Sequence, residues 1–420
     1  MINEPLQLPS HFRKMTAENR QNAFYGPLGL PDGPQGIEGL EPSLADAMVE
    51  NSIGYFALPL GVVPEFPVNG KTWNLPLATE EPSVIAAASY AGKILSKAGG
   101  LAAEAEPALM KAEIFIENSQ LTPTEFLKEF RIPLENALEP HLASMNARGG
   151  GLRDITVRRL PLTGVLLIQI LVNVCDAMGA NLLNSLAEKT APLIEEWTGG
   201  RKLMAILSNN ADQRLARARF SIPVDQLAKA GVSGEEMGRR LEMAWKVAGE
   251  DPDRAITHNK GIMNGITAFA LATGNDTRAL EASVHIYAQR TGTCKPLSTF
   301  HVENSILIGE IELPLSFAVV GGAMGIHPQA QAHLKALGNP NAQEISALAA
   351  ALGLAQNFAA LYALVGEGIQ KGHMALHARR LAFQAGARGI QVDTTAARIA
   401  EKGVFNHQGA EEALKDLSGS

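Results

Sequence analysis

The chain has 420 residues, of which 46% are hydrophobic and 19% charged, with a formal net charge of -7 and a pI near 5.9. These values exclude a disordered chain and provide no basic field for nucleic acid. Two cysteines, Cys175 and Cys294, are too few for a disulfide framework, so the expected location is the reducing cytoplasm.

The length predicts two or three domains with ample core. Apolar runs at 164–172 and 347–354 are shorter than the roughly 18 to 20 residues that a membrane span needs. The N-terminus has no cationic region followed by an apolar one. We therefore expect neither a signal peptide nor a membrane segment.

The first predicted element is a helix over residues 82–97. Pro82 suits a first-turn position, the alanines at 86–88 favour helix, and Gly99 ends it. So many alanines let neighbouring elements approach closely. This predicts a buried central helix.

A change of hydrophobic period marks the next segment. Strands are predicted at 111–116, 152–159, 164–174 and 202–207, and helices at 123–146 and 181–198. The resulting order, βαββαβ, is the ferredoxin-like motif, here inserted into a larger mixed domain.

Helices return after residue 221. Ser233 and Glu236 have the spacing of a capping box, which predicts a helix through Val247. A strand pair is expected over 303–320, then a glycine turn, an alanine-rich helix after Pro328, helical structure over 346–377 and a small helical appendage. The predicted fold class is α+β.

The segment 253–265, followed by 273–276, concentrates polar side chains and glycines among apolar surroundings. Lys260 with Asp276 nearby would hold a cation against a developing oxyanion, and glycines allow close approach of a substrate. The alternative is that Lys260 is a solvated surface lysine and that Asn275 or Asp276 caps a helix beginning at Thr277.

Glu81 directly precedes Pro82, which disfavours helical backbone at Glu81 and places it at the lip of the helix. A partly desolvated carboxyl there can donate a proton. The alternative is that Glu80 and Glu81 only complement the helix dipole.

No GxGxxG fingerprint is present, so the candidate nucleotide site is the segment 176–181, between an apolar strand and a helix. Free N–H groups at the helix start would bind a pyrophosphate, and Gly179 allows backbone approach. The alternative is a structural turn capped by Asp176 or Asn181.

His373 and His377 share one face of a predicted helix, which suits a metal pair. Neither an HExxH motif nor a third nearby ligand is present, so no metal is predicted. The remaining alternative is a structural pair of histidines.

These four motifs, in this order, resemble the hydroxymethylglutaryl-CoA (HMG-CoA) reductase family from about residue 40 to residue 400. The soluble class of bacteria and archaea (class II), especially its mevalonate-degrading members, is the most similar. The resemblance implies interconversion of HMG-CoA with mevalonate and coenzyme A through mevaldehyde, by two hydride transfers with NAD(P)(H).

The resemblance also implies residue roles. The catalytic residues are Glu81, Lys260, Asp276 and His373, with His377 as structural support. The substrate contacts are Ser83, Arg254 and Asn264. The dinucleotide contacts are Asp176, Ala177, Met178, Gly179 and Asn181.

The cofactor choice rests on the overall resemblance, which favours NAD(H) over NADP(H). Family members that use NAD carry an aspartate where this chain has Leu142. Glu139 could replace it, whereas Arg148 could instead favour a 2′-phosphate.

The implied architecture is a large coenzyme A domain (1–108 and 212–372), a small dinucleotide-binding domain (109–211) and a C-terminal flap (373–420), with the site at a homodimer interface. Two alternatives from other classes are a metal-dependent hydrolase that uses His373, His377 and Asp276, and a non-catalytic helical scaffold. The sequence leaves the physiological direction of the reaction open.

Overall fold

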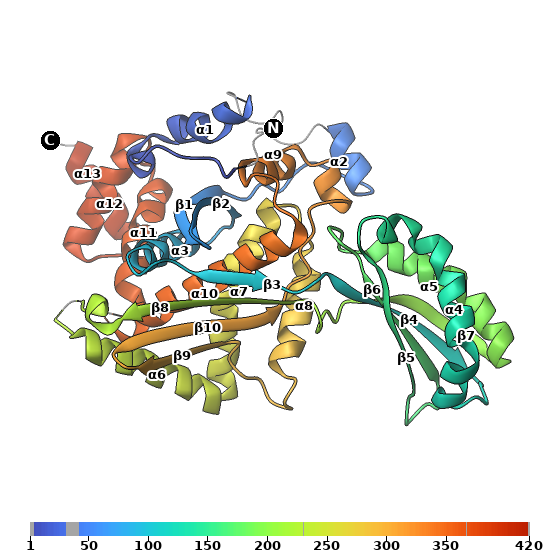
Figure 1. Cartoon of the computed structure of the whole chain (residues 1–420). Coiled ribbons are helices and arrows are strands. Elements are labelled where there is room, and N and C mark those ends of the chain that lie inside the picture. The colour runs from blue at the N-terminus through green and yellow to red at the C-terminus, as the bar shows by residue number, and fades with distance from the viewer. Residues whose placement is uncertain (1–3, 31–41, 230, 367, 419–420) are drawn as a thin grey trace.

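The computed structural model describes residues 4–30, 42–229, 231–366 and 368–418. Figure 1 shows a large body from which a smaller body projects on one side. The large body holds two antiparallel sheets, with strands in the orders β1-β2 and β3-β8-β10-β9. These strands are β1 (Leu60–Val68), β2 (Lys71–Ala78), β3 (Ala102–Ala105), β8 (Leu215–Pro223), β9 (Ser298–Glu303) and β10 (Ile306–Pro314).

Helices surround these sheets. The α-helices of the large body are α1 (Ala17–Tyr25), α2 (Pro42–Met48), α3 (Pro82–Ser96), α6 (Gly234–Glu250), α7 (Pro252–Ala272), α8 (Thr277–Ala288), α9 (Pro328–Ala336) and α10 (Ala342–Val365). Short 3-10 helices are η1 (Phe12–Lys14), η2 (Gly26–Leu28), η3 (Val224–Leu227) and η4 (Gly322–Gly325).

Helix α10 is the central helix of the large body. It packs against α3, α7 and the four-stranded sheet, and most of its side chains are buried. Among the described residues it is the one helix long and apolar enough to span a membrane, and burial in the core accounts for that composition. The expectation that 82–97 forms the buried central helix is wrong, since Ala86 and Lys93 on α3 are exposed. Only one face of α3 packs on the core.

The small body has the predicted ferredoxin-like topology. Its elements are β4 (Leu109–Glu117), α4 (Pro123–Asn146), β5 (Gly151–Arg159), β6 (Leu166–Asn173), α5 (Ala180–Thr198) and β7 (Arg201–Ser208). The strand order is β5-β6-β4-β7, with antiparallel neighbours throughout. A separate hydrophobic core, which includes Ile114, Phe126 and Ile170, fills the space between sheet and helices.

Two local predictions in the large body need correction. The strand pair expected over 303–320 is instead β9 with β10, turning at Asn304 and Ser305, which have positive φ of 49° and 60°. The expected capping box is half formed: Ser233 Oγ accepts from the Glu236 N–H at 3.2 Å, but the Glu236 carboxylate pairs with Arg239 and Arg240.

The chain ends in three helices, α11 (Ile369–Gln384), α12 (Ile390–Lys402) and α13 (His407–Ser418). They enclose a small apolar cluster of their own, which includes Leu381 and Ile399. In Figure 1 they lie beside α3 and α1, away from the small body. The predicted appendage is therefore present, and its first helix begins at Ile369, before the expected boundary at 373.

Candidate active site

Glu81 occupies the N-cap position of α3, with the extended backbone (φ -91°, ψ 116°) that Pro82 imposes. Its carboxylate accepts a hydrogen bond from Ser83 Oγ at 3.0 Å. Glu81 is half-buried whereas Glu80 is exposed. The structure therefore separates the two neighbouring carboxyls and directs Glu81 to a polar site.

Lys260 lies in the middle of α7, a helix that contains the whole polar segment 253–265. Its Nζ is 3.4 Å from Glu81 Oε2, so residues 179 positions apart in the chain form an ion pair. Asn264 follows one turn later on the same face. Arg254 is turned from Lys260 by about 120° around the helix, and no contact joins these two described side chains.

Asp276 acts as the N-cap of α8, accepting from the N–H groups of Arg278 and Ala279 at 3.0 and 3.1 Å. This confirms the capping interpretation. Helix α7 continues for 12 residues from Lys260 to Ala272, about 18 Å along its axis, before the chain reaches Asp276. The expected Lys260–Asp276 contact is not formed among the described residues of this chain.

A buried polar network lies beneath Lys260. His258 Nε2 is 2.6 Å from Ser298 Oγ, and that hydroxyl donates to Asn357 Oδ1 at 2.8 Å. Because the hydroxyl proton is committed to Asn357, the hydrogen between His258 and Ser298 belongs to Nε2. Burial, with a smaller contribution from the charge of Arg254, lowers the pKa of His258 to about 3. The network fixes the inner face of α7 with a neutral imidazole.

The segment 176–181 forms the turn from β6 into α5. Gly179 is the N-cap, with φ of 96°, and a Cβ there would lie 2.7 Å from Val174 Cγ1. Neither Asp176 nor Asn181 caps the helix, so that alternative is wrong. Within the described part of the chain, the N–H groups of Ala180 and Asn181 have no protein partner, as an anion-binding helix start requires.

This turn is also tied to the large body. The Asp176 carboxylate accepts from the N–H of Ala342, the first residue of α10, at 2.9 Å. The buried guanidinium of Arg214 donates to the carbonyls of Ala177, at 3.3 Å, and of Phe317. Burial lowers the pKa of Arg214 to about 10, partly offset by the charge of Asp176. Sequence reasoning missed Arg214 because it lies outside every motif.

The glycine loop after α4 packs against the same turn, since a Cβ on Gly150 would lie 2.6 Å from Cys175 Sγ. Leu142, at the position expected to contact ribose, is only 1% exposed and belongs to the core of the small body. Arg148 is exposed, and its guanidinium donates to the carbonyl and hydroxyl oxygens of Ser144 at 3.1 and 3.3 Å.

A cavity of about 1290 Å³ opens along α3 from Pro82, the residue after Glu81. The described residues that line it include no acidic side chain and six basic ones: Arg13, Arg20, Lys93, Lys97, Lys229 and Arg379. These come from five separate segments, so sequence spacing gave no signal for them. Such a cavity suits an elongated polyanion.

The predicted His373 belongs to the first turns of α11, and its side chain lies outside the described residues. His377 is half-buried. In the described ranges, no three side chains of His, Cys, Asp or Glu gather as a metal site would require.

The profile of the hydroxymethylglutaryl-coenzyme A reductase family matches residues 34–378. The 3-hydroxy-3-methylglutaryl-coenzyme A reductase of Archaeoglobus fulgidus is 42% identical over 97% of this chain and 94% of its own. A probable 3-hydroxy-3-methylglutaryl-coenzyme A reductase of Borreliella burgdorferi is 40% identical over 80% of this chain and 77% of its own.

The solved reductase of Streptococcus pneumoniae superposes with a TM-score of 0.79, at 36% identity over 97% of this chain and 99% of its own. Another structure of the Streptococcus pneumoniae enzyme is described as class II and bound to NADPH in open conformations. It is 37% identical, covers 85% of this chain and 99% of its own, and superposes with a TM-score of 0.79.

The fold, the site and these similarities define an NAD(P)-dependent oxidoreductase. The chain belongs to the hydroxymethylglutaryl-coenzyme A reductase family, and its similarities confirm the expected resemblance to the class II members. The metal-dependent hydrolase and the helical scaffold have no support in these comparisons.

Proposed function

We propose that this chain interconverts HMG-CoA and mevalonate plus coenzyme A at the Glu81–Lys260 pair. The observation that carries this assignment is the 3.4 Å contact between the half-buried Glu81 carboxyl and Lys260, next to Pro82, which lines a basic cavity. A proton donor and a fixed cation are the groups that reduction of a carbonyl needs from a protein.

In the first reduction, Lys260 would stabilise the oxygen that becomes negative when hydride reaches the thioester carbon. Loss of such a charge typically costs about 3 to 4 kcal/mol in the barrier. His373 would protonate the departing thiolate of coenzyme A, with His377 as structural support.

In the second reduction, Glu81 would protonate the oxygen of mevaldehyde. Ser83, which donates to Glu81 at 3.0 Å, would orient that carboxyl and contact the substrate. Asn264, one turn from Lys260, would orient the lysine. Arg254 would bind the free carboxylate, and Asp276 would tune Lys260.

The coenzyme A portion would occupy the basic cavity. Helix α3 lines it from Pro82 to Lys97, a length of about 22 Å, so its N-terminal end serves the reacting group and its C-terminal end the phosphates. Six basic and no acidic side chains in the described lining favour the polyanionic coenzyme A over a neutral ligand.

The dinucleotide, which supplies hydride when bound, would rest its pyrophosphate on the free N–H groups at the start of α5. The contacts would come from Asp176, Ala177, Met178, Gly179 and Asn181. We propose NAD(H) over NADP(H), because Arg148 is already hydrogen-bonded within its own turn and is not held ready for a 2′-phosphate.

The domain division proposed is 1–108 with 212–372 for coenzyme A, 109–211 for the dinucleotide and 373–420 for the flap, in a cytoplasmic homodimer. Separate hydrophobic clusters support three units. The separation of Asp276 from Lys260 along α7 supports a site that is completed by a second copy of the chain.

A mixing experiment tests this arrangement. Since Glu81 and Lys260 meet within one chain, a mixture of Lys260→Ala and Asp276→Asn chains should regain activity, whereas a mixture of Glu81 and Lys260 variants should not.

A spectrophotometric assay tests the reaction. Purified protein with mevalonate and coenzyme A should reduce NAD more efficiently than NADP, without added metal. No reduction of either cofactor, together with no binding of HMG-CoA, would refute the proposed function. A higher kcat/KM with NADP would refute only the cofactor preference.

A further inference from the structure

Arg214, directly before β8, is a buried cation outside every motif. It is only 3% exposed, and its guanidinium donates to the carbonyls of Ala177, at 3.3 Å, and of Phe317. Ala177 belongs to the turn before α5, whereas Phe317 follows β10 in the large body. A buried guanidinium is costly unless its donors are satisfied, and its planar fork can satisfy two acceptors at once. Arg214 therefore ties these two segments together.

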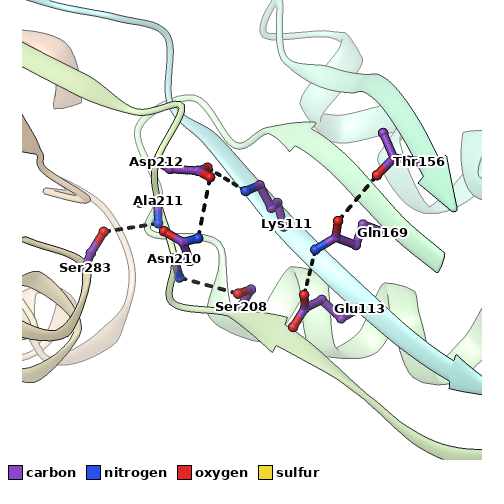
Figure 2. Close-up of polar contacts among 9 residues, drawn as sticks. All are labelled: Lys111, Glu113, Thr156, Gln169, Ser208, Asn210, Ala211, Asp212 and Ser283. Atoms are coloured by element: carbon purple, nitrogen blue, oxygen red, sulfur yellow. Dashed lines mark hydrogen bonds and ion pairs between the residues drawn. The ribbon is translucent and has the colours of Figure 1, made fainter. Parts of the chain in front are cut away.

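The crossover segment, residues 209–214 between β7 and β8, holds Arg214 in place. The N–H of Ala211 donates to the buried Ser283 Oγ on α8 at 3.1 Å. Lys111 on β4 forms an ion pair with Asp212. Figure 2 shows the segment held on one side by Ser283 and on the other by Lys111. The base of the Arg214 side chain is thus fixed by contacts with both bodies.

The turn before α5 meets the large body at the same place. The carbonyl of Asp176 accepts from the N–H of Val319 at 2.9 Å, and the next carbonyl, that of Ala177, is bound by Arg214. In a planar trans peptide the carbonyl and the following N–H point in opposite directions. Anchoring the Ala177 carbonyl therefore turns the N–H of Met178 away from the guanidinium. The contact sets the orientation of the peptide that leads to the free N–H groups at the start of α5.

We propose that Arg214 is a positioning residue for the dinucleotide. By holding the Ala177 carbonyl against the large body, it directs the N–H groups at the start of α5 toward the pyrophosphate. Its own guanidinium is buried and bound to two carbonyls, so it acts through the turn. The inference rests on the dinucleotide site proposed above.

Arg214→Met removes the donors and keeps a side chain of some length. We expect the Kd of NADH to rise at least about tenfold while the Kd of HMG-CoA changes less than about twofold, because the cavity along α3 is not altered. Arg214→Lys keeps the charge but has a single head group in place of the fork, so it should recover only part of the affinity for NADH. Fluorescence titration measures each Kd.

The matched control is Arg217→Met. Arg217 lies three residues further on, in β8, and its guanidinium joins Glu106 and Glu312 at 2.7 Å each. Loss of these ion pairs should change stability but leave the Kd of NADH within about twofold. The comparison separates an effect on the turn from a general effect of losing an arginine near the crossover segment.

A second measurement needs neither turnover nor ligand. Hydrogen–deuterium exchange of a peptide covering residues 174–183 should be at least about threefold faster in Arg214→Met, since the turn loses an anchor. It should be less affected in Arg214→Lys and unchanged in Arg217→Met. Arg214→Lys carries both measurements if Arg214→Met does not fold.

An unchanged Kd of NADH in folded Arg214→Met would overturn the inference, even if exchange became faster. Equal weakening of NADH and HMG-CoA binding would also overturn it, because it would mean that Arg214 has only a general structural role. A wild-type protein that binds HMG-CoA but no dinucleotide would instead refute the proposed dinucleotide site. The exchange measurement would then still decide whether Arg214 holds the turn.

Discussion

Lys260 combines an exposed charge with a rigid support. Its side chain is 62% exposed, while the two residues before it on α7, His258 and the fully buried Asn259, hold the helix against the core. Asn259 donates to the carbonyl of Lys295 at 2.8 Å and accepts from the N–H of Leu297 at 3.0 Å. The helix backbone at Lys260 is therefore fixed, while its ammonium group, paired with Glu81, stays exposed to a substrate.

Lys260→Ala should lower kcat by about 10² to 10³ because the charge acts on a transient oxyanion. Its thermal stability should change little, since no core contact is removed. Steady-state kinetics and a melting curve check this, with Lys246→Ala, another exposed lysine in an ion pair, as the control. A large drop in the melting temperature would mean that the residue is structural.

Two buried histidines make stability depend on pH. His333 Nδ1 donates to the carbonyl of Ala272 at 2.5 Å, and its Nε2 accepts from the hydroxyl of Tyr25 at 2.9 Å. Burial lowers the pKa of His333 to about 4 and that of His258 to about 3. Both therefore stay neutral in the folded state at pH values where an unfolded histidine gains a proton.

The sign follows from proton uptake by the unfolded state. Above pH ~6.5 neither state binds the proton, whereas below it only the unfolded state does, so stability falls as pH falls toward 4. Between pH 6 and pH 4.5 each histidine should contribute a slope of about 1.4 kcal/mol per pH unit. Urea unfolding should show a smaller slope in His333→Gln, but not in a variant of the exposed His141. Equal slopes in all three proteins would contradict this account.

At the scale of elements, the start of α5 joins three segments. Gly179 begins the helix, Met178 packs on the core of the large body, and the glycine loop after α4 approaches Cys175. The positive φ of Gly179 and the close contact with Val174 both exclude a side chain there. The proposed dinucleotide site therefore depends directly on the geometry of this turn.

Gly179→Ala should weaken binding of NAD or NADPH at least about tenfold, because the added methyl displaces the N–H groups of the first turn. Binding of HMG-CoA in the large body should be retained. Gly199→Ala is the matched control: Gly199 also has positive φ, at the other end of α5, but a Cβ there meets nothing within 4 Å. Fluorescence titration with each cofactor measures the affinity of both variants. Equally weak cofactor binding in the two variants would indicate a general loss of stability.

At the scale of the whole molecule, three of the hydrophobic clusters support different parts of the protein. The largest supports the Glu81–Lys260 pair, the second supports the start of α5, and the third holds α11 to α13 together. The third is small, and α11 reaches the basic cavity through Arg379. We therefore propose that the C-terminal helices move as a unit without disturbing the two larger cores.

Ending the chain after Ala378 should leave both larger cores folded and still able to bind HMG-CoA. Turnover should fall at least about tenfold, which corresponds to about 1.4 kcal/mol on the barrier. Circular dichroism and ligand titration provide the controls for folding. Full activity in the shortened chain would show that this segment has no role in the reaction.

The sequence by itself determined the elements whose cause is local. Pro82 set the start of α3, the 2- and 3.6-residue hydrophobic periods gave the βαββαβ order, and the four motifs indicated the family. Local reasoning failed at Asn304 and Ser305, where two positive φ values make a turn that ordinary residue preferences do not signal. It also chose α3 as the central helix, because alanine content does not reveal which helix is covered on every side.

Only the tertiary structure decided which side chains meet. Three contacts join positions that are distant in the chain or lie on separate elements: the Glu81–Lys260 ion pair, the Thr267–Glu281 hydrogen bond and the Arg214–Ala177 hydrogen bond. The packing of α3, α7, α8 and the sheets brings these residues together. Asp276 does not meet Lys260 of the same chain because it caps α8 beyond the far end of α7. A sequence shows which groups are present, but burial and helix packing determine the distances and charges through which they act.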